Sequence, residues 1–310
     1  MLYSPKLMHI PDGFLSLTVS IICWVITAII LSVAISRSNR SLGERQVPLM
    51  GVMAAFIFAA QMINFPVAGG TSGHLLGGAL AAITLGPWAG MLVMTAVIAV
   101  QGLLFQDGGL LVMGANILNM GLITAAIGYG LYRGVSLRNK TLKVTVAGVA
   151  AWLSVMAGAL STSLQLWLSG TSQLQIVIPA MLTVHALIGV GEALITVAAL
   201  TFIFQTRPDL IGENSVSAKA SRGWVVAGIL ISLAVVLLSP LASANPDGLN
   251  RVATDLGFIH TAQTRVGPLA GYTIPFLASV SLSKIATGAL GLAVVAVIIV
   301  LLGQGMKAKS

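Results

Sequence analysis

Long apolar runs, separated by short polar stretches, make up most of the 310-residue chain. Cutting the sequence wherever charged residues, Pro or Gly cluster leaves nine such runs. A helix needs about 20 mostly apolar residues to cross the hydrocarbon core of a bilayer. The runs lie approximately at residues 14–36, 48–64, 74–86, 87–106, 109–132, 144–169, 175–205, 223–241 and 284–303. The pattern predicts an all-α polytopic membrane protein with about nine transmembrane helices.

The third and fourth runs are separated only by Gly86-Pro87, because residues 74–105 are otherwise one apolar stretch. A proline can end one helix and begin the next. We therefore expect two crossings here. Merging them would move every later loop to the other side of the membrane.

The composition agrees with a membrane protein. Hydrophobic residues make up 57% of the chain and charged residues only 8%, against roughly 25% charged residues in soluble domains. The bulk of the chain is therefore expected to lie in lipid, in the plasma (inner) membrane of the cell. The single cysteine, Cys23, lies inside an apolar run, which excludes a disulfide framework or a cysteine-based metal site.

The charge is lopsided, with 16 Lys and Arg against 8 Asp and Glu, and it has two explanations. An excess of cations is typical of nucleic-acid binders, but cytoplasmic loops of membrane proteins are also enriched in Lys and Arg. Placed on the nine runs, twelve cations fall on one side and four on the other. The larger group comprises Arg37, Arg40, Arg45, Arg133, Arg138, Lys140, Lys143, Arg207, Lys219, Arg222, Lys307 and Lys309, and the smaller one Lys6, Arg251, Arg265 and Lys284. This split predicts the N-terminus outside and the C-terminus inside, and it removes the reason to expect a nucleic-acid partner.

The runs fall into two portions. Residues 1–205 contain seven runs joined by short loops, and residues 206–222 form a polar linker predicted to be cytoplasmic. Residues 223–310 contain the last two runs, which enclose an outer loop at 242–283. The sequence therefore predicts a seven-helix domain followed by a two-helix domain.

Two of the four histidines, His9 and His74, fall at the outer membrane surface in this topology. His9 precedes the first run, and His74 opens the third run after a loop that begins at Phe65. Imidazole nitrogens bind nickel, copper and zinc. Two surface histidines are nevertheless more often incidental than metal ligands, so the residues alone leave both interpretations open.

The chain resembles the CbiM/NikM family in three segments: MHIPDGF at 8–14, VAGGTSGHLLGGAL at 67–80 and LGPWAG at 85–90. Members of this family are the substrate-binding membrane subunits of energy-coupling-factor cobalt and nickel importers. The segment ANPDGLN at 244–250 is similar to the small two-span companion subunit called NikN, or PDGLE domain, here fused to the first portion. The family motif ends in an acid where this chain has Asn250, which puts any role of that acid in doubt.

The resemblance implies a metal site made by Met8, His9 and His74. In the family, the donors are the free amine of an N-terminal Met, the deprotonated backbone nitrogen and imidazole of the next His, and a second His from the loop matching 65–74. Fused chelate rings of this kind are nearly flat, and a fourth nitrogen completes a plane that favours Ni(II) or Cu(II) over Zn(II). Loading is expected to weaken as pH falls, because the amide proton must be lost.

Met8 departs from the family pattern, because Met1–Leu7 precede it. An internal Met has an amide nitrogen and cannot supply the first donor. We therefore predict that translation starts at Met8 or that the first seven residues are removed.

Five further polar residues could support the metal from outside its ligand shell: Asp12, Asn116, Asn119, His185 and Glu192. Asp12 is predicted to fix a turn that holds the N-terminal segment, and Asn116 and Asn119 could hydrogen-bond to neighbouring helices. His185 could orient a metal ligand, but a helix–helix hydrogen bond is the more ordinary role. Glu192 could be a protonated buried acid or line a release path.

Two polar features fall in the outer loop. Pro246-Asp247-Gly248 is predicted to form an ordinary turn, with a cap over the site as the alternative, and His260 is predicted to be solvated.

The leading function is therefore capture of Ni(II) at the outer face by a subunit that uses a separate ATPase. The resemblance implies two kinds of partner, a transmembrane coupling (T) subunit and cytoplasmic ATPase subunits. The same role for Co(II) is the alternative, and an ion-coupled secondary transporter is a distant one. The sequence has no phosphate-binding G-x-x-x-x-G-K-[ST] loop and no H-E-x-x-H or G-x-S-x-G motif, so we expect neither an ATPase nor an enzyme. No permanent cofactor is expected.

Overall fold

The computed structural model describes residues 8–43, 46–135, 138–206, 223–263 and 267–307. The segment Met1–Leu7, residues 207–222 of the predicted linker, and the cations Arg45, Arg265 and Lys309 lie outside these described residues. Within them, the chain is built almost entirely of helices, which confirms the predicted all-α class.

Seven helical segments of the described chain are long and apolar enough to cross a membrane. They are α1 (Leu17–Ser41), α4 (Pro87–Leu104), the rod formed by α5 (Met113–Asn116), a π-helical stretch (Ile117–Ile123) and α6 (Thr124–Tyr132), α7 (Lys140–Leu168), α8 (Leu174–Thr206), α9 (Gly223–Leu238) and α11 (Val280–Lys307). Each matches one of the predicted apolar runs.

The other two predicted spans form helices shorter than these seven. The second run forms α2 (Gln46–Gln61), a helix of 16 residues. The third forms only α3 (Gly78–Leu85), whose eight residues rise about 12 Å. The prediction of a full helix over 74–86 is therefore wrong, although the division at Gly86-Pro87 is confirmed: Gly86 has a φ of 83° and Pro87 is the first residue of α4.

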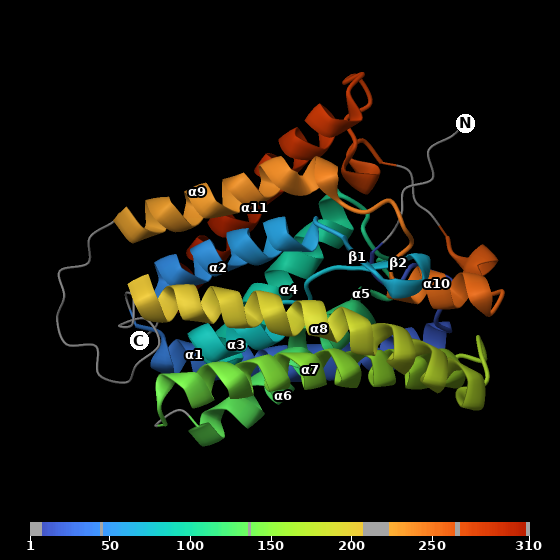
Figure 1. The fold of residues 1–310 in the computed structure, drawn as a ribbon, viewed down its shortest axis with the longest axis horizontal. Helices are drawn as coiled ribbons and strands as arrows, with labels where there is room; N and C mark the ends of the chain where they lie inside the picture. The colour runs from blue at the N-terminus through green and yellow to red at the C-terminus, as the bar shows by residue number, and fades with distance from the viewer. Residues whose placement is uncertain (1–7, 44–45, 136–137, 207–222, 264–266, 308–310) are drawn as a thin grey trace.

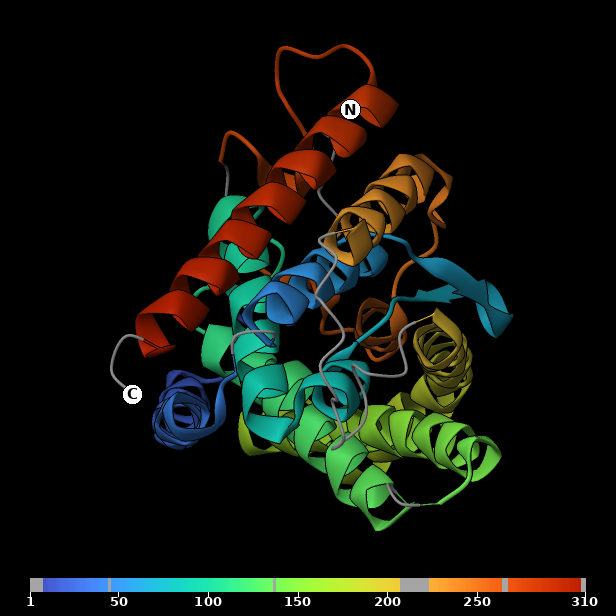
Figure 2. The same ribbon diagram turned by 90° about the vertical axis from the view of Figure 1, so that its left-hand side faces the viewer.

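The helices pack as two neighbouring groups. In one group, α9 and α11 flank α2, and in the other α7 lies between α6 and α8. Helices α3 and α4 contact each other, and they connect the two groups through contacts of α3 with α6 and of α4 with α2. Figures 1 and 2 show the same arrangement from two directions.

One end of the bundle carries the non-helical elements. A hairpin of β1 (Phe65–Val67) and β2 (Thr71–Gly73) pairs antiparallel, with Phe65 opposite Gly73. It lies beside α10 (Gly248–Asp255), a helix within the predicted outer loop (Figure 1). The backbone N–H of Ser72 donates to Pro246 O at 2.8 Å. The predicted outer loop therefore docks onto the hairpin that leads to His74.

Candidate metal site

A cavity of about 70 Å³ lies beneath this end of the bundle. Its walls come from the segment before α1, the loop after β2, the α5 rod, α7, α8 and α10. The residues around it include Met8, His9, His74, Asn116, Asn119, His185 and Leu249. The structure therefore brings together six of the eight residues that the sequence selected, while Asp12 and Glu192 do not line the cavity.

His9 and His74 lie side by side in this cavity. Their ring centroids are 5.8 Å apart, and the rings meet edge to face at 66°. Both side chains are buried inside the protein, and their place at the outer membrane face stays a prediction. The outer loop takes part in enclosing the cavity, because Leu249 of α10 forms part of its wall.

The imidazole of His74 has one nitrogen near each of two carbonyl oxygens. Nδ1 lies 3.0 Å from Leu75 O, and Nε2 lies 3.2 Å from Met8 O. A neutral imidazole has one N–H and one lone pair, so it can donate to only one of them. When Nδ1 donates to Leu75 O, Nε2 carries the lone pair and faces the Met8–His9 peptide.

Asp107, which the sequence did not select, holds the Met8–His9 segment. The Met8 backbone N–H donates to Asp107 Oδ1 at 2.7 Å, and His9 Nδ1 lies 2.9 Å from Asp107 O. His9 Nε2 is buried without a hydrogen-bond partner in the described structure. The only signal for Asp107 in the sequence was that it is one of eight acids and follows an apolar run.

Asp12 holds the start of the α5 rod. Its carboxylate accepts hydrogen bonds from the backbone N–H groups of Leu110, Leu111 and Val112, at 3.2, 2.9 and 3.3 Å. A side chain at Gly109 would collide with it, because an added Cβ would lie 2.1 Å from Asp12 Oδ1. Asp12 therefore fixes the N-terminal segment by capping a distant helix start, and it also lies in the local turn closed by the hydrogen bond from Phe14 N to Pro11 O.

Asn116 binds the backbone of the same segment. Its Oδ1 accepts from Ile10 N and its Nδ2 donates to Ile10 O, both at 3.0 Å. Asn119, one turn further along, donates to Thr162 and Gln165 of α7 at 3.1 and 2.8 Å. The predicted hydrogen bonding of Asn119 to a neighbouring helix is confirmed.

On α8, the helix–helix hydrogen bond predicted for His185 is not formed by its Nδ1, whereas the predicted burial of Glu192 is confirmed. Nδ1 of His185 bonds to Met181 O of its own helix at 2.8 Å, so the described structure contains no helix–helix bond from this nitrogen. Glu192 is fully buried and accepts from the backbone N–H groups of Leu76 and Gly77 at 2.6 and 2.8 Å. It therefore serves the irregular backbone that joins His74 to α3, and it is not among the residues that line the described cavity.

Asp247 begins α10, so the prediction of an ordinary turn at Pro246–Gly248 is wrong. Its side chain accepts from Asn250 N at 2.7 Å, as an N-cap residue does. Asn250 is thus the third residue of the helix, where an acid would close a capping box. Asp247 itself is buried, and burial raises the pKa of its carboxyl group to about 7.

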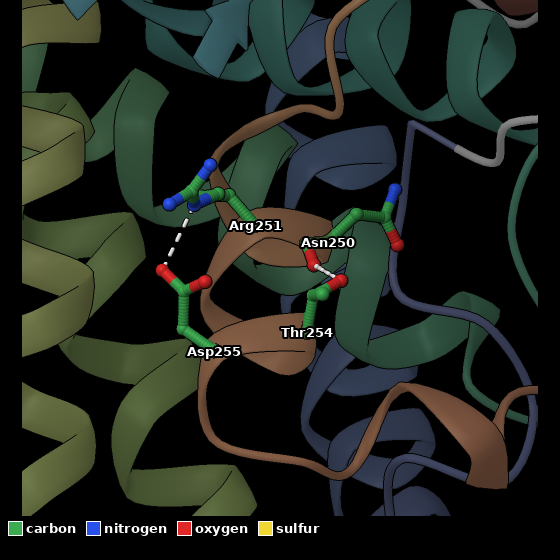
Figure 3. Close-up of polar contacts among 4 residues, drawn as sticks. All are labelled: Asn250, Arg251, Thr254 and Asp255. Carbon is green, nitrogen blue, oxygen red and sulfur yellow. Dashed lines mark hydrogen bonds and ion pairs between the residues drawn. The ribbon is translucent and has the colours of Figure 1, made fainter. Parts of the chain in front are cut away.

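The opposite face of α10 is polar. Arg251 Nε pairs with Asp255 Oδ2 at 2.8 Å, and Thr254 Oγ1 donates to Asn250 O at 2.7 Å (Figure 3). An exposed pair of this kind contributes at most about 1 kcal/mol. His260 is exposed, as predicted.

Side chains alone do not make a metal centre here. In the part of the chain that the structure describes, no cluster of three or more His, Cys, Asp and Glu side chains could hold a metal ion. A metal bound between His9 and His74 would therefore need backbone or terminal nitrogens as further donors.

Comparison with known proteins gives consistent results. Residues 9–210 match the CbiM family model, described as a cobalt uptake substrate-specific transmembrane region. A relative from Archaeoglobus fulgidus, provisionally named as fused nickel transport protein NikMN, is 35% identical over 272 residues, which cover 87% of this chain and 90% of that protein. Fused nickel transport protein NikMN from Rhodobacter capsulatus is 26% identical over 93% of this chain and 95% of its own length. The crystal structure of a truncated transition metal transporter aligns with a TM-score of 0.58 at 35% identity, covering 64% of this chain and 99% of that one.

Proposed function

Since the chain belongs to the CbiM family of multi-pass membrane transport proteins for nickel and cobalt, we propose that it is the subunit that captures Ni(II) for an energy-coupling-factor importer. The family is one of transport proteins and not of enzymes. The observation that carries the proposal is the burial of His9 and His74 in one cavity, with ring centroids 5.8 Å apart. The Met8 backbone reaches the same cavity.

The proposed donors are the amine of Met8, the backbone nitrogen and imidazole of His9, and the imidazole of His74. Two of these atoms, Met8 N and His9 Nδ1, bond to Asp107 in the structure, so loading would exchange or reorient these bonds. Met8 can supply an amine only as the first residue of the functional protein. N-terminal sequencing of the transport-competent protein tests this start, and an intact Met1 would contradict the four-nitrogen site.

Nickel is the preferred metal for two reasons. A planar set of four nitrogens suits Ni(II), and two relatives that align along 87% and 93% of this chain carry names of nickel transport proteins. The alternative is the same role for Co(II), which also accepts nitrogen donors. Competitive uptake of the two metals decides between them.

The cavity end of the bundle is proposed to face outward, with the N-terminus outside and the C-terminus inside. The C-terminal ends of α6 and α8 lie at the opposite end (Figure 1), and cation-rich segments follow both in the sequence. The proposed partners are a transmembrane coupling subunit and cytoplasmic ATPase subunits. A secondary transporter would instead accumulate nickel in proteoliposomes without any ATPase.

The proposed site is tested by moving the N-terminus. We expect protein that begins at Met8 to bind Ni(II) in a titration, and a version that keeps residues 1–7 to bind far more weakly. The preceding residues turn the Met8 amine into an amide, so the loss should exceed the roughly 10–100-fold that removal of an outer-shell partner costs. Equal affinity of the two versions would contradict the proposal.

Loading is expected to depend steeply on pH. Binding displaces the amide proton of His9 and, below about pH 8, a proton from the Met8 amine. Lower pH therefore favours the unloaded protein, and the apparent affinity should fall about tenfold per pH unit for each proton released. Titrations between pH 6 and 8 measure this slope, and a flat profile would argue against an amidate donor.

A further inference from the structure

The C-terminal portion of the chain is linked to Met8 through one acidic side chain, Asp107. Asp107 is buried, and its two carboxylate oxygens have different partners. Oδ1 accepts from the Met8 backbone N–H at 2.7 Å, and Oδ2 accepts from the hydroxyl of Tyr272 at 2.9 Å. Tyr272 lies between α10 and α11, in the two-helix portion of the chain. One carboxylate thus joins that portion to the nitrogen proposed as the first metal donor.

Tyr272 is held firmly at this junction. Its ring stacks on Phe105 at 4.8 Å and 14°, and Gly271 N donates to Phe105 O at 2.9 Å. Thr287 of α11 donates from its hydroxyl to Tyr272 O at 3.1 Å. Phe105 holds the Tyr272 ring, and the two hydrogen bonds hold the backbone at Gly271 and Tyr272. The hydroxyl therefore has a defined position relative to Asp107.

The backbone here is unusual. Gln106 and Tyr272 have φ values of 53° and 60°, and they are the non-glycine residues of the described chain in the left-handed region. Such conformations persist where the surrounding structure over-determines them, and they cluster at functional sites. One flanks Asp107 and the other bonds to it.

We propose that Tyr272 is a positioning residue for metal capture, which orients the Asp107 carboxylate toward the Met8 nitrogen. Through Tyr272, the two-helix portion of the chain fixes the position of the first metal donor. This inference rests on the proposed function. A metal-bound amine keeps N–H groups, so Asp107 Oδ1 can accept from it while the nitrogen lone pair faces the metal. A carboxylate held at Oδ2 cannot rotate away from that nitrogen.

Tyr272 is a suitable donor for this role. Burial, followed by the neighbouring Asp107 charge, raises the pKa of its hydroxyl above the ordinary value, so the group keeps its proton. Its phenol can donate to the carboxylate while its ring stays on Phe105.

The test is Tyr272→Phe in the protein that begins at Met8, which removes the hydroxyl and keeps the ring. We expect the Ni(II) affinity to fall about 10–100-fold, as for other outer-shell partners, and the ligand-field absorption of bound Ni(II) to change. The matched control is Tyr132→Phe, because Tyr132 is also buried but does not line the cavity. The control should leave affinity and spectrum unchanged.

Asp107→Asn provides a second variant with nearly the same shape. If Tyr272 acts through Asp107, the double variant should bind Ni(II) no more weakly than Asp107→Asn alone. Additive losses, or wild-type affinity and spectrum in Tyr272→Phe, would overturn the inference while leaving the proposed function standing. Failure of the unsubstituted protein to bind Ni(II) would overturn the proposed function and this inference with it.

Discussion

Replacing His74 by alanine is expected to reduce the Ni(II) affinity of the protein more than 100-fold. His74 is the proposed donor from outside the Met8–His9 segment, and its Nε2 lies 3.2 Å from Met8 O. Loss of a direct ligand should exceed the roughly 10–100-fold effect of losing an outer-shell partner. A four-nitrogen plane would lose one corner, so the absorption of any Ni(II) still bound should change too. Ni(II) titration of the purified variant measures both effects.

The matched control is His260→Ala. His260 is exposed in the outer loop, outside the cavity lining, so its removal should leave the affinity unchanged. A His74→Ala variant that binds Ni(II) like the unsubstituted protein would remove His74 from the site. Equal losses in both variants would point to nonspecific binding by surface imidazoles.

Replacing Glu192 by leucine is expected to destabilise the fold by about 2–6 kcal/mol. Glu192 accepts from the N–H groups of Leu76 and Gly77, and each buried donor left without an acceptor costs about 1–3 kcal/mol. Thermal unfolding in detergent should therefore show a lower midpoint. Because Leu76 and Gly77 follow His74 closely, Ni(II) binding should weaken as well.

Glu192→Gln separates hydrogen bonding from side-chain size. The two N–H groups bond to different oxygens of Glu192, and glutamine places an NH₂ group where one of these oxygens lies, so in the same geometry it can accept from only one of them. Its loss of stability should lie between those of the unsubstituted protein and Glu192→Leu. If the leucine variant unfolded at the unsubstituted midpoint, the two hydrogen bonds would not stabilise the native state.

The helices were predictable because their apolar runs are long. The exception is the start of α3, where an apolar run at 74–86 contains only eight helical residues. Non-helical backbone inside a membrane protein is tolerated only where protein groups satisfy it. Here Glu192 serves two N–H groups, and Gln61 Nε2 donates to Leu76 O at 2.7 Å. Hydrophobic periodicity carries no sign of such distant partners.

The candidate site was predictable in part, through segments that resemble a family. His9 and His74 are neighbours in the structure, as that resemblance implies. Asp107 and Tyr272 were missed, because their partners lie 99 and 165 residues away in the sequence. The start of α10 was predicted wrongly. Asp247-Gly248 fits a turn, but Asp is also a common N-cap residue immediately before a helix. The apolar spacing of Leu249, Val252 and Ala253 would have favoured the helix.

The pairing of Asn116 with both backbone groups of Ile10 affects the thermodynamics of metal capture. Fixing the backbone of one residue costs roughly 1–2 kcal/mol in conformational entropy. A free Met-His peptide would lose that entropy each time a metal binds. In this protein the Asn116 amide, acting like a neighbouring β-strand, restricts the segment as the chain folds. Calorimetry should therefore show a smaller entropic penalty for Ni(II) binding than a short peptide with the same first residues.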